Sequence, residues 1–268
     1  MWKRMLMCIS GLGLFIIFLN YITETIPLKL YSDVPLYGDF SVLCYNVKCK
    51  DKNFRDNQIK IANEILKESP DVVFLCEMHR SVGRNLDSVL TRQGGYKSCY
   101  RSGANCIFYS RYVTDSIKGL DTGTSRGRNA LNNLVHVNTP QGPITIIGCH
   151  LSSSGSGIID GYRGRKREVD SIYKVCINEI RPLIVMGDFN DVSGTYPINR
   201  LKEAGLKDAW WEAGKGYGTT FHEGWLKLRI DHILYDYEKI KLVGVKVMDN
   251  NLSDHNALMA TFRIKMKQ

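Results

Sequence analysis

Five apolar segments of the sequence lead into a polar residue that could take part in metal or acid–base chemistry. The run IVMG is followed by Asp188, and earlier runs end at Asn46, Glu77 and His150. A fifth segment, RIDHI, carries Asp231. Short apolar runs are typical of buried strands, and strand ends in α/β enzymes converge on one edge of a sheet. We therefore expect these five side chains to meet in one site.

Two further motifs add ligands of the same kind. Asn190 follows Asp188 by two positions in GDFND, and Asp254 and His255 are adjacent in SDHNAL. Side chains two apart on an extended segment share a face, so Asn190 is expected beside Asp188. Carboxylate and amide oxygens suit a hard cation, and histidine suits proton transfer or contact with phosphate. The alternative is that Gly, Asp and Asn form only a tight turn.

The composition indicates one folded domain with a basic surface. The chain has 268 residues, of which 44% are hydrophobic and 10% aromatic, which is enough for one large α/β domain but not for two. The formal net charge is +9 and the pI is near 9.1. This charge favours an anionic partner such as nucleic acid, phospholipid head groups or a phosphorylated metabolite, although solvated lysines alone could also account for it.

The N-terminus resembles a membrane-targeting segment. Lys3 and Arg4 precede a mostly apolar run that reaches Leu19, near the lower length limit of a membrane-spanning helix. No small-residue cleavage site follows, which favours an uncleaved anchor over a cleaved signal peptide. We expect residues 1–23 to form one hydrophobic helix that anchors an extracytoplasmic catalytic domain in the membrane. If the segment is cleaved, the protein is secreted instead.

Beyond a linker at residues 24–37, apolar patterning alternates between strands and helices. Strand-like runs occupy residues 40–47, 71–78, 105–110, 130–139, 143–151 and 182–190. Helical spacing occupies residues 57–69, 81–93 and 167–180. Segments at residues 200–210, 229–236, 241–249 and 257–265 complete a second half. No repeat or low-complexity segment interrupts this pattern, so residues 38–268 are expected to form one domain.

The eight cysteines do not form a metal or redox motif. No Cys-x-x-Cys pair is present, so neither a zinc site nor a dithiol site is expected. Cys44, Cys76 and Cys149 lie in apolar runs and are interpreted as small buried hydrophobes. Cys99 and Cys106 flank a hairpin turn, YRSGAN, and are the one pair that could form a disulfide, although free thiols are favoured there.

The ordered motifs YN, CE, CHL, GDFND, RIDHI and SDHNAL resemble those of the endonuclease/exonuclease/phosphatase superfamily, of the deoxyribonuclease I type. The resemblance covers residues 41–262. It implies an α/β fold, a four-layer α/β/β/α sandwich of two mixed sheets, here preceded by the N-terminal hydrophobic helix. It also implies a divalent-metal-dependent hydrolase of phosphate esters.

The resemblance assigns roles to the motif residues. Glu77 is implied as the main ligand of Mg²⁺, or of Mn²⁺, with Asn46 and Asp254 completing the metal site. The implied catalytic set is His150, Asp188, Asn190, Asp231 and His255. In this set the pair in GDFND orients the attacking water, and Asp231 holds the ring of His255.

Several neighbouring residues depart from the family pattern or are excluded from the site. A histidine at position 150, where repair nucleases of the family have tyrosine, argues against the apurinic-site repair branch. Lys48 stands where repair members often carry an aspartate, which leaves a second metal open. His232 and Cys149 are each adjacent to a site residue on a strand and are expected to face the opposite way.

Basic side chains are the main indication of substrate, and Trp225 could stack on a base or touch a lipid surface. Arg126 and Arg128 in SRGRN, and Arg163 and Arg165 in GYRGRKRE, are candidate contacts to substrate phosphates, although the second group could be a solvated helix start. A nuclease is the leading interpretation, and a monomer is expected. The alternatives are a phospholipid or sphingomyelin phosphodiesterase, a phosphomonoester or pyrophosphate phosphatase, and a non-catalytic membrane-tethered binding module.

Overall fold

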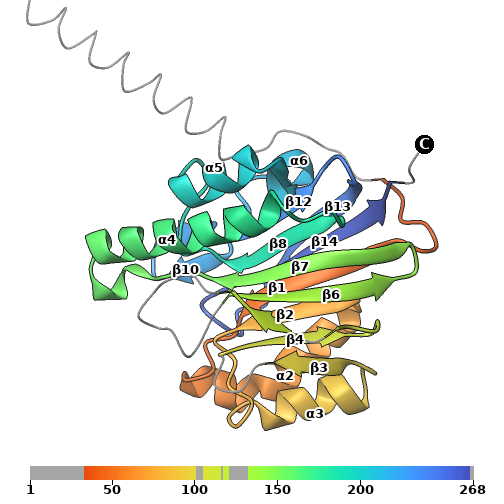
Figure 1. Ribbon diagram of the computed structural model, residues 1–268. Coiled ribbons are helices and arrows are strands. Elements are labelled where there is room, and N and C mark those ends of the chain that lie inside the picture. Colours follow the sequence, from red (N-terminus) through yellow and green to blue (C-terminus); the bar gives the residue numbers. More distant parts are fainter. Residues whose placement is uncertain (1–32, 101–104, 116, 121–131, 266–268) are drawn as a thin grey trace, which may run out of the picture.

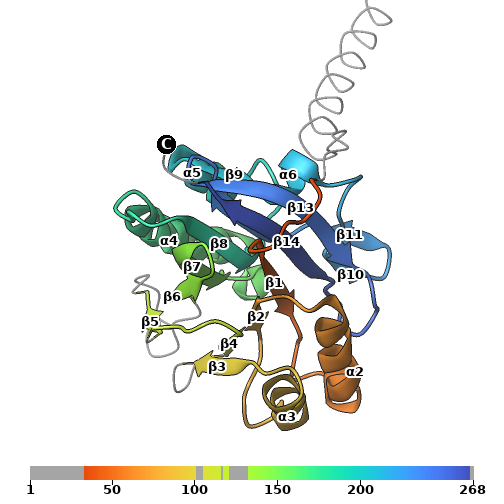
Figure 2. The ribbon, with the colours of Figure 1, turned by 90° about the vertical axis from the view of Figure 1, so that its right-hand side faces the viewer.

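The computed structural model describes residues 33–100, 105–115, 117–120 and 132–265. Two six-stranded sheets pack face to face, and helices cover their outer faces (Figures 1 and 2). Both sheets contain parallel and antiparallel strands, so the predicted sandwich of two mixed sheets is confirmed for the described residues. The predicted N-terminal hydrophobic helix, residues 1–23, lies outside them. Within them, no helix has the length and apolar character needed to cross a membrane.

The strands divide between the two sheets as follows. The first sheet contains β1 (Phe40–Asn46), β2 (Val72–Cys76), β3 (Lys97–Tyr100), β4 (Cys106–Ser110), β13 (Ile240–Met248) and β14 (Ala257–Ile264), in the order β13-β14-β1-β2-β4-β3. The second contains β5 (Lys118–Gly119), β6 (Asn133–Thr139), β7 (Gly142–His150), β8 (Leu183–Asp188), β9 (Leu206–Asp208) and β12 (Asp231–Asp236), in the order β5-β6-β7-β8-β12-β9. A hairpin of β10 (Phe221–Glu223) and β11 (Leu226–Leu228) stands beside them.

The helices lie on the two outer faces and at one edge. They are α2 (Lys52–Glu68), α3 (Arg84–Arg92), the 3₁₀ turn η1 (Ser154–Ser156), α4 (Ile158–Cys176), α5 (Tyr196–Glu203) and α6 (Ala209–Ala213). Helices α2 and α3 pack on the first sheet, and α4 and α5 pack on the second. The apolar side chains therefore form three layers: one between the sheets and one beneath each pair of helices.

Strand direction and register place the polar strand ends together. β1 is parallel to β2 and β7 is parallel to β8, so each parallel pair ends on the same side of its sheet. In the second sheet Asp188 is the partner of His150 on one neighbouring strand and of Asp231 on the other. Gly148 allows the two sheets to approach, because a Cβ there would lie 2.4 Å from the ring of Phe74.

Helices α2 and α4 both begin earlier than their apolar spacing predicts. Helix α2 starts at Lys52 because the side chain of Asp51 accepts a hydrogen bond from the backbone N–H of Asn53 and caps the first turn. Helix α4 starts nine residues before the predicted helix. Its first half contains Gly161 and Gly164, where a Cβ would lie within 3 Å of the loop after β7. Close packing on that loop thus replaces the apolar pattern of an ordinary amphipathic helix.

The cysteines among the described residues are free thiols, as the sequence favoured. β3 and β4 form the expected antiparallel hairpin, but Cys99 is opposite Phe108, and Cys106 is opposite Cys76 on the neighbouring strand. The seven cysteines among the described residues are free thiols, so the Cys99–Cys106 disulfide is absent. Cys149 is buried among apolar side chains beneath α4, facing away from the polar strand ends as expected.

Candidate active site

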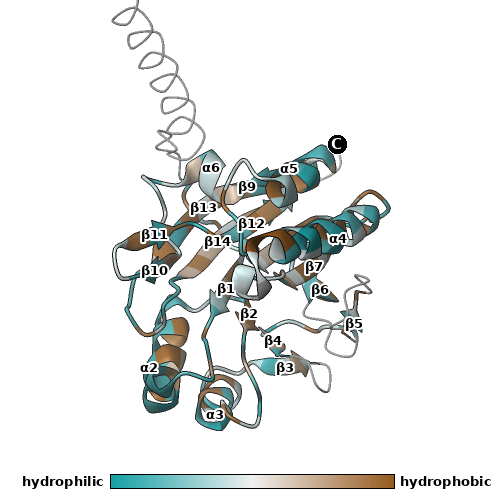
Figure 3. Cartoon of the chain, turned by 90° about the vertical axis from the view of Figure 1, so that its left-hand side faces the viewer, coloured by the Kyte–Doolittle hydropathy of each residue, from teal (hydrophilic) through white to brown (hydrophobic). Residues whose placement is uncertain are grey.

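The eight motif residues gather at one end of the sandwich, where both sheets contribute strand ends. Figure 3 looks onto this end, with the β10–β11 hairpin on one side and α4 on the other. The residues brought together are Asn46, Glu77, His150, Asp188, Asn190, Asp231, Asp254 and His255. The sequence-based expectation that these side chains meet in one place is therefore confirmed as geometry.

Asp188 is at the centre of the group and is almost fully buried. Its Oδ1 accepts a hydrogen bond from the backbone N–H of Asn190 at 2.8 Å, and its Oδ2 accepts one from Asn46 Nδ2 at 2.9 Å. The same Oδ2 lies 3.8 Å from His150 Nε2 and 3.9 Å from His255 Nε2. Asp188 Oδ2 therefore lies within 4 Å of both imidazole rings.

Asn46 joins the carboxylates of the two sheets. Its Nδ2 donates to Glu77 Oε1 at 3.1 Å and to Asp188 Oδ2, while its Oδ1 accepts from the backbone N–H of Lys48 at 3.1 Å. The amide nitrogen thus fixes both carboxylates, while the amide oxygen accepts from the backbone. Glu77 has a backbone φ of 49°, which is uncommon for a residue other than glycine, and its side chain is 36% exposed. Its carboxylate is open to the solvent side of the site.

His255 and Asp231 form a buried pair. Nδ1 of the ring lies 2.8 Å from Asp231 Oδ2, and the ring of Phe221 packs edge-on at a centroid distance of 5.0 Å. Burial disfavours the charged ring, but the charge of Asp231 and then that of Asp188 raise the pKa of His255 to about 9. Burial also raises the pKa of Asp231, and the charge of Asp188 adds to that rise. The pair therefore favours the charged ring, with Nδ1–H toward Asp231 and Nε2 directed toward Asp188.

His150 approaches Asp188 from the other side. Its backbone N–H donates to Asn132 Oδ1 at 3.2 Å, and its Nε2 lies 3.7 Å from Glu77 Oε1. Burial opposes ring protonation, whereas the hydrogen bond with Cys106 and the charges of Asp188 and Glu77 raise the pKa of His150 to about 9. The buried Nδ1 of His150 has no hydrogen-bond partner within the described part of the chain, so Nε2 is the ring nitrogen that faces the carboxylates.

The expectation that Asn190 extends from the strand beside Asp188 is wrong in detail. Asn190 has a φ of 50°, so the chain has already turned and the two side chains do not share a strand face. Its Nδ2 donates to the carbonyl oxygen of Leu151 at 2.9 Å, which ties the GDFND turn to the loop after β7. Asn190 belongs to the site through its backbone bond to Asp188 and through this tie.

Asp254 is engaged by an ammonium group. Lys48 Nζ lies 2.5 Å from Asp254 Oδ2, and Ser253 Oγ donates to Asp254 Oδ1 at 3.2 Å and to the carbonyl of Asn46 at 3.0 Å. The side chain of Lys48 is 45% exposed and that of Asp254 is 20% exposed, so the ion pair lies at the mouth of the site.

The predicted substrate arginines divide into different environments. Arg165 is only 6% exposed, and it binds Asp191 Oδ2 at 2.8 Å and the carbonyl of Ser152 at 3.0 Å. The prediction of a phosphate contact is therefore wrong for Arg165, because its guanidinium supports the loop after β7 from within. Arg163 is exposed on α4. Arg126 and Arg128 lie outside the described residues.

The donor atoms of the site fit a hard divalent cation. Ligand atoms of Asp188, Asp231 and His255 lie within 4.8 Å of one another, and Asn46 joins Asp188 to the partly exposed carboxylate of Glu77. Because His255 Nδ1 faces Asp231, the carboxylates are the groups that could hold a cation. Asp231 Oδ1 is buried and has no hydrogen-bond partner within the described part of the chain. Carboxylate oxygens in this number suit Mg²⁺ or Mn²⁺ rather than a soft metal. Glu77 would be the main ligand, because it is the most accessible of these carboxylates.

Three supporting residues were not predicted from sequence. Asn132 holds the backbone of His150, Phe221 packs on His255, and Ser253 fixes both the loop before β14 and Asp254. The Ser-Asp-His order offered a signal for Ser253, whereas nothing local marks Asn132. His232 faces away as predicted, and its Nε2 bonds the carbonyl of Asp191 at 3.0 Å.

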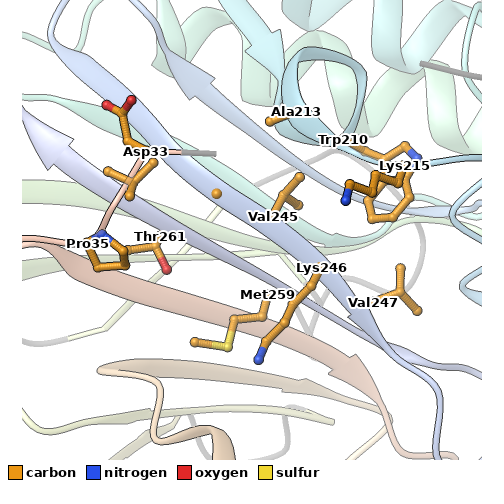
Figure 4. Close-up of a pocket in the computed structure, with 12 residues that line it drawn as sticks. Asp33, Pro35, Trp210, Ala213, Lys215, Val245, Lys246, Val247, Met259 and Thr261 are labelled. Carbon is orange, nitrogen blue, oxygen red and sulfur yellow. The ribbon is translucent and has the colours of Figure 1, made fainter. Parts of the chain in front are cut away.

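A separate cavity of about 620 Å³ lies along the edge strand β13, away from the polar strand ends (Figure 4). Its walls include Trp210 and Val247 on one side and Pro35 and Met259 on the other. None of the eight motif residues lines it. The cavity is therefore not part of the candidate active site.

Comparisons with known proteins give a family and a fold. The profile of the Endonuclease/Exonuclease/phosphatase family matches residues 43–255. Zebrafish (D. rerio) TDP2 humanized by 14 mutations superposes with a TM-score of 0.67 at 19% identity, covering 84% of this chain and 99% of its own. A family protein from Leptotrichia buccalis gives a TM-score of 0.67 at 18% identity and 85% and 100% coverage.

A third structure, the human Nocturnin catalytic domain with bound sulfate anion, gives a TM-score of 0.62 at 16% identity, covering 85% of this chain and 94% of its own. No curated protein sequence matches significantly. At these identities the structural similarity establishes the fold alone.

Proposed function

This chain belongs to the Endonuclease/Exonuclease/phosphatase family, and we propose that it is a divalent-metal-dependent phosphodiesterase. One observation carries the proposal. Asp188 Oδ2 accepts a hydrogen bond from Asn46 Nδ2 and faces the Nε2 atoms of both His150 and His255. Glu77 lies beside this group with an accessible carboxylate. Carboxylates for a cation, with two imidazole rings whose Nε2 atoms lie within 4 Å of one carboxylate oxygen, are the groups that hydrolysis of a phosphate ester requires.

The residues have distinct tasks in the proposed reaction. A bound divalent ion would polarise the phosphoryl group and compensate its charge. Asp188 orients the attacking water and takes its proton, because its carboxylate is held in place by Asn46 and by the backbone N–H of Asn190 at the centre of the site. His255, held by Asp231, presents its Nε2 proton to a phosphate oxygen, and His150 does so from the other side. Asn46 keeps the carboxylates of Glu77 and Asp188 in place.

We propose nucleic acid as the leading substrate. A net charge of +9 favours a polyanion, and a related structure, zebrafish TDP2 at 17% identity and a TM-score of 0.66, is complexed with single strand DNA product. A phospholipid or sphingomyelin is the second candidate. It is favoured by Trp225 on the β10–β11 hairpin and by Ile158 at the start of α4, which are 91% and 80% exposed on elements beside the site.

We also propose that residues 1–23 anchor the protein in a membrane, with the catalytic domain extracytoplasmic, or secreted if the segment is removed. The apolar run behind Lys3 and Arg4 supports this proposal. The test is whether the native full chain remains in the membrane fraction after a carbonate wash. A soluble form that begins near residue 24 would show that the segment is cleaved.

Hydrolysis assays with the purified full chain test the proposed activity. The substrates are single- and double-stranded DNA, RNA, sphingomyelin, a lipid pyrophosphate and inositol phosphates, each with Mg²⁺ and with EDTA. We expect hydrolysis of one class that stops in EDTA and returns with Mg²⁺ or Mn²⁺. Glu77→Gln should reproduce the effect of EDTA, whereas Glu64→Gln, on the exposed face of α2, should leave turnover unchanged. Full activity in EDTA would refute the proposal.

A further inference from the structure

Lys48 combines two contacts at the mouth of the site. Its backbone N–H donates to Asn46 Oδ1 and thereby turns the amide nitrogen of Asn46 toward the carboxylates. Its ammonium group lies 2.5 Å from Asp254 Oδ2, although the two residues are 206 positions apart in sequence. The backbone of Lys48 has a φ of 45°, a conformation uncommon for a residue other than glycine. Residues held in such conformations are frequent at functional sites.

The carboxylates of Asp254 and Glu77 differ in the hydrogen-bond and ion-pair partners of their oxygens. Both oxygens of Asp254 already have a partner, Ser253 Oγ on one and the ammonium group of Lys48 on the other. Glu77 Oε1 accepts a hydrogen bond from the neutral amide of Asn46 and lies 3.7 Å from His150 Nε2, and within the described residues its Oε2 accepts no hydrogen bond. A divalent ion can therefore bind Glu77 Oε2 without displacing a hydrogen-bonded partner. At Asp254 it would have to compete with a cation that the chain itself supplies.

We propose that Lys48 is the permanent cation of Asp254, so that the protein binds a single divalent ion through Glu77 and without a contribution from Asp254. The inference rests on the proposed function only in requiring that a divalent ion binds. A lysine ammonium carries one positive charge and cannot ligate a metal, so it neutralises a carboxylate and repels a second ion. Lys48 is thus a positioning and specificity residue, which sets the number of ions in the site.

The test is calorimetric titration of the metal-free full chain, in detergent, with Mn²⁺ and without substrate. The wild type should bind one ion per chain. Glu77→Gln should weaken the Kd about 10–100-fold, as is typical when a group that fixes a metal is changed. Asp254→Asn should change the Kd by less than about threefold, because an exposed pair with Lys48 already neutralises that carboxylate.

The decisive comparison is a double-mutant cycle. Lys48→Met keeps the length of the side chain and removes its charge, so it should free Asp254 and tighten Mn²⁺ binding about tenfold. In the Lys48→Met background, Asp254→Asn should then cost about the same factor, unlike in the wild type. Lys48→Arg should behave as the wild type does. Lys50→Met is the matched control, since it removes an exposed lysine two positions away.

Two results would overturn the inference while leaving the proposed function intact. One is a wild type that binds two ions, and the other is an Asp254→Asn variant as defective in binding as Glu77→Gln. A wild type that binds no divalent ion would overturn both the inference and the proposed function. A protein that binds one ion as described but hydrolyses no phosphodiester would remove only the proposed function. Circular dichroism of every variant confirms folding before the titrations are compared.

Discussion

Replacing Asp231 by asparagine tests whether the carboxylate of Asp231 keeps the ring of His255 charged. The substitution keeps the volume of the side chain and removes the carboxylate that lies 2.8 Å from Nδ1 of the ring. The amide oxygen can still accept from Nδ1–H, so the ring should keep its orientation but lose its charged partner. We expect the pKa of His255 to fall and turnover to fall with it.

The size of the effect follows from the pKa of the ring. A rise from 6.5 to about 9 in the folded protein corresponds to about 3 kcal/mol in favour of the charged ring, shared mainly between Asp231 and Asp188. Because the folded pKa is raised, this stabilisation is fully present below pH 6.5 and is lost as the pH rises through 9. Stability of the metal-free wild type should therefore decline over that range. The decline should be smaller in Asp231→Asn, because the pKa of His255 is raised less in that variant. The contribution of His150 is the same in both proteins and does not affect the comparison.

Two measurements follow the prediction. Urea unfolding of the metal-free proteins between pH 6 and pH 10 reports the difference in stability, and the NMR signals of the His255 ring report its pKa directly. Turnover of the substrate that the hydrolysis assays identify is then measured for Asp231→Asn, His255→Ala and the double variant. We expect about a 10²–10⁴-fold loss for His255→Ala and a smaller loss for Asp231→Asn. The double variant should be little worse than His255→Ala, as for residues that act as a unit.

Losses that multiply in the double variant would refute this reasoning, because they would mean that Asp231 does not act through His255. An unchanged pKa of His255 in Asp231→Asn would refute the electrostatic part separately. Asp236→Asn is a matched control, since it changes an aspartate at the far end of the same strand, β12.

Two further predictions concern the structure that supports the site. Arg229→Met should destabilise the protein by about 3–5 kcal/mol in urea unfolding, because it leaves the buried carboxylate of Asp208 without its guanidinium partner at 2.9 Å; a loss below 1 kcal/mol would contradict this. Gly187→Ala should cost about 3 kcal/mol, since φ is 136° and a Cβ would lie 2.0 Å from the carbonyl oxygen of Cys149. Unchanged thermal unfolding would show that the two strands can separate there.

The sequence by itself located the strands and the polar residues at their ends. Apolar runs of strand length that stop at Asn46, Glu77, His150 and Asp188 set both the strands and their chemical ends, because strand formation follows local patterning. The order of the motifs then indicated the family and its two mixed sheets. The N-terminal segment at residues 1–23 remains a prediction from composition.

Local patterning was insufficient where packing decides the conformation. Helix α4 begins at Ile158 because glycines let it pack against the loop after β7, a contact that no periodicity encodes. Arg165 reads as a surface residue in GYRGRKRE, yet it is buried against Asp191. The turn at Asn190 replaced the predicted extended segment, because its backbone N–H bonds the side chain of Asp188.

Only the tertiary structure decided which polar groups are partners. Asn46 meets Asp188 across 142 positions, and Lys48 meets Asp254 across 206. The physical reason is that these contacts depend on how two sheets, each set by its own local pattern, are packed against one another and closed by loops. A residue type and its spacing predict the groups available to a site. The distances that place Asp188 beside two imidazole rings, and Asp254 beside the ammonium group of Lys48, exist only after the sheets have packed.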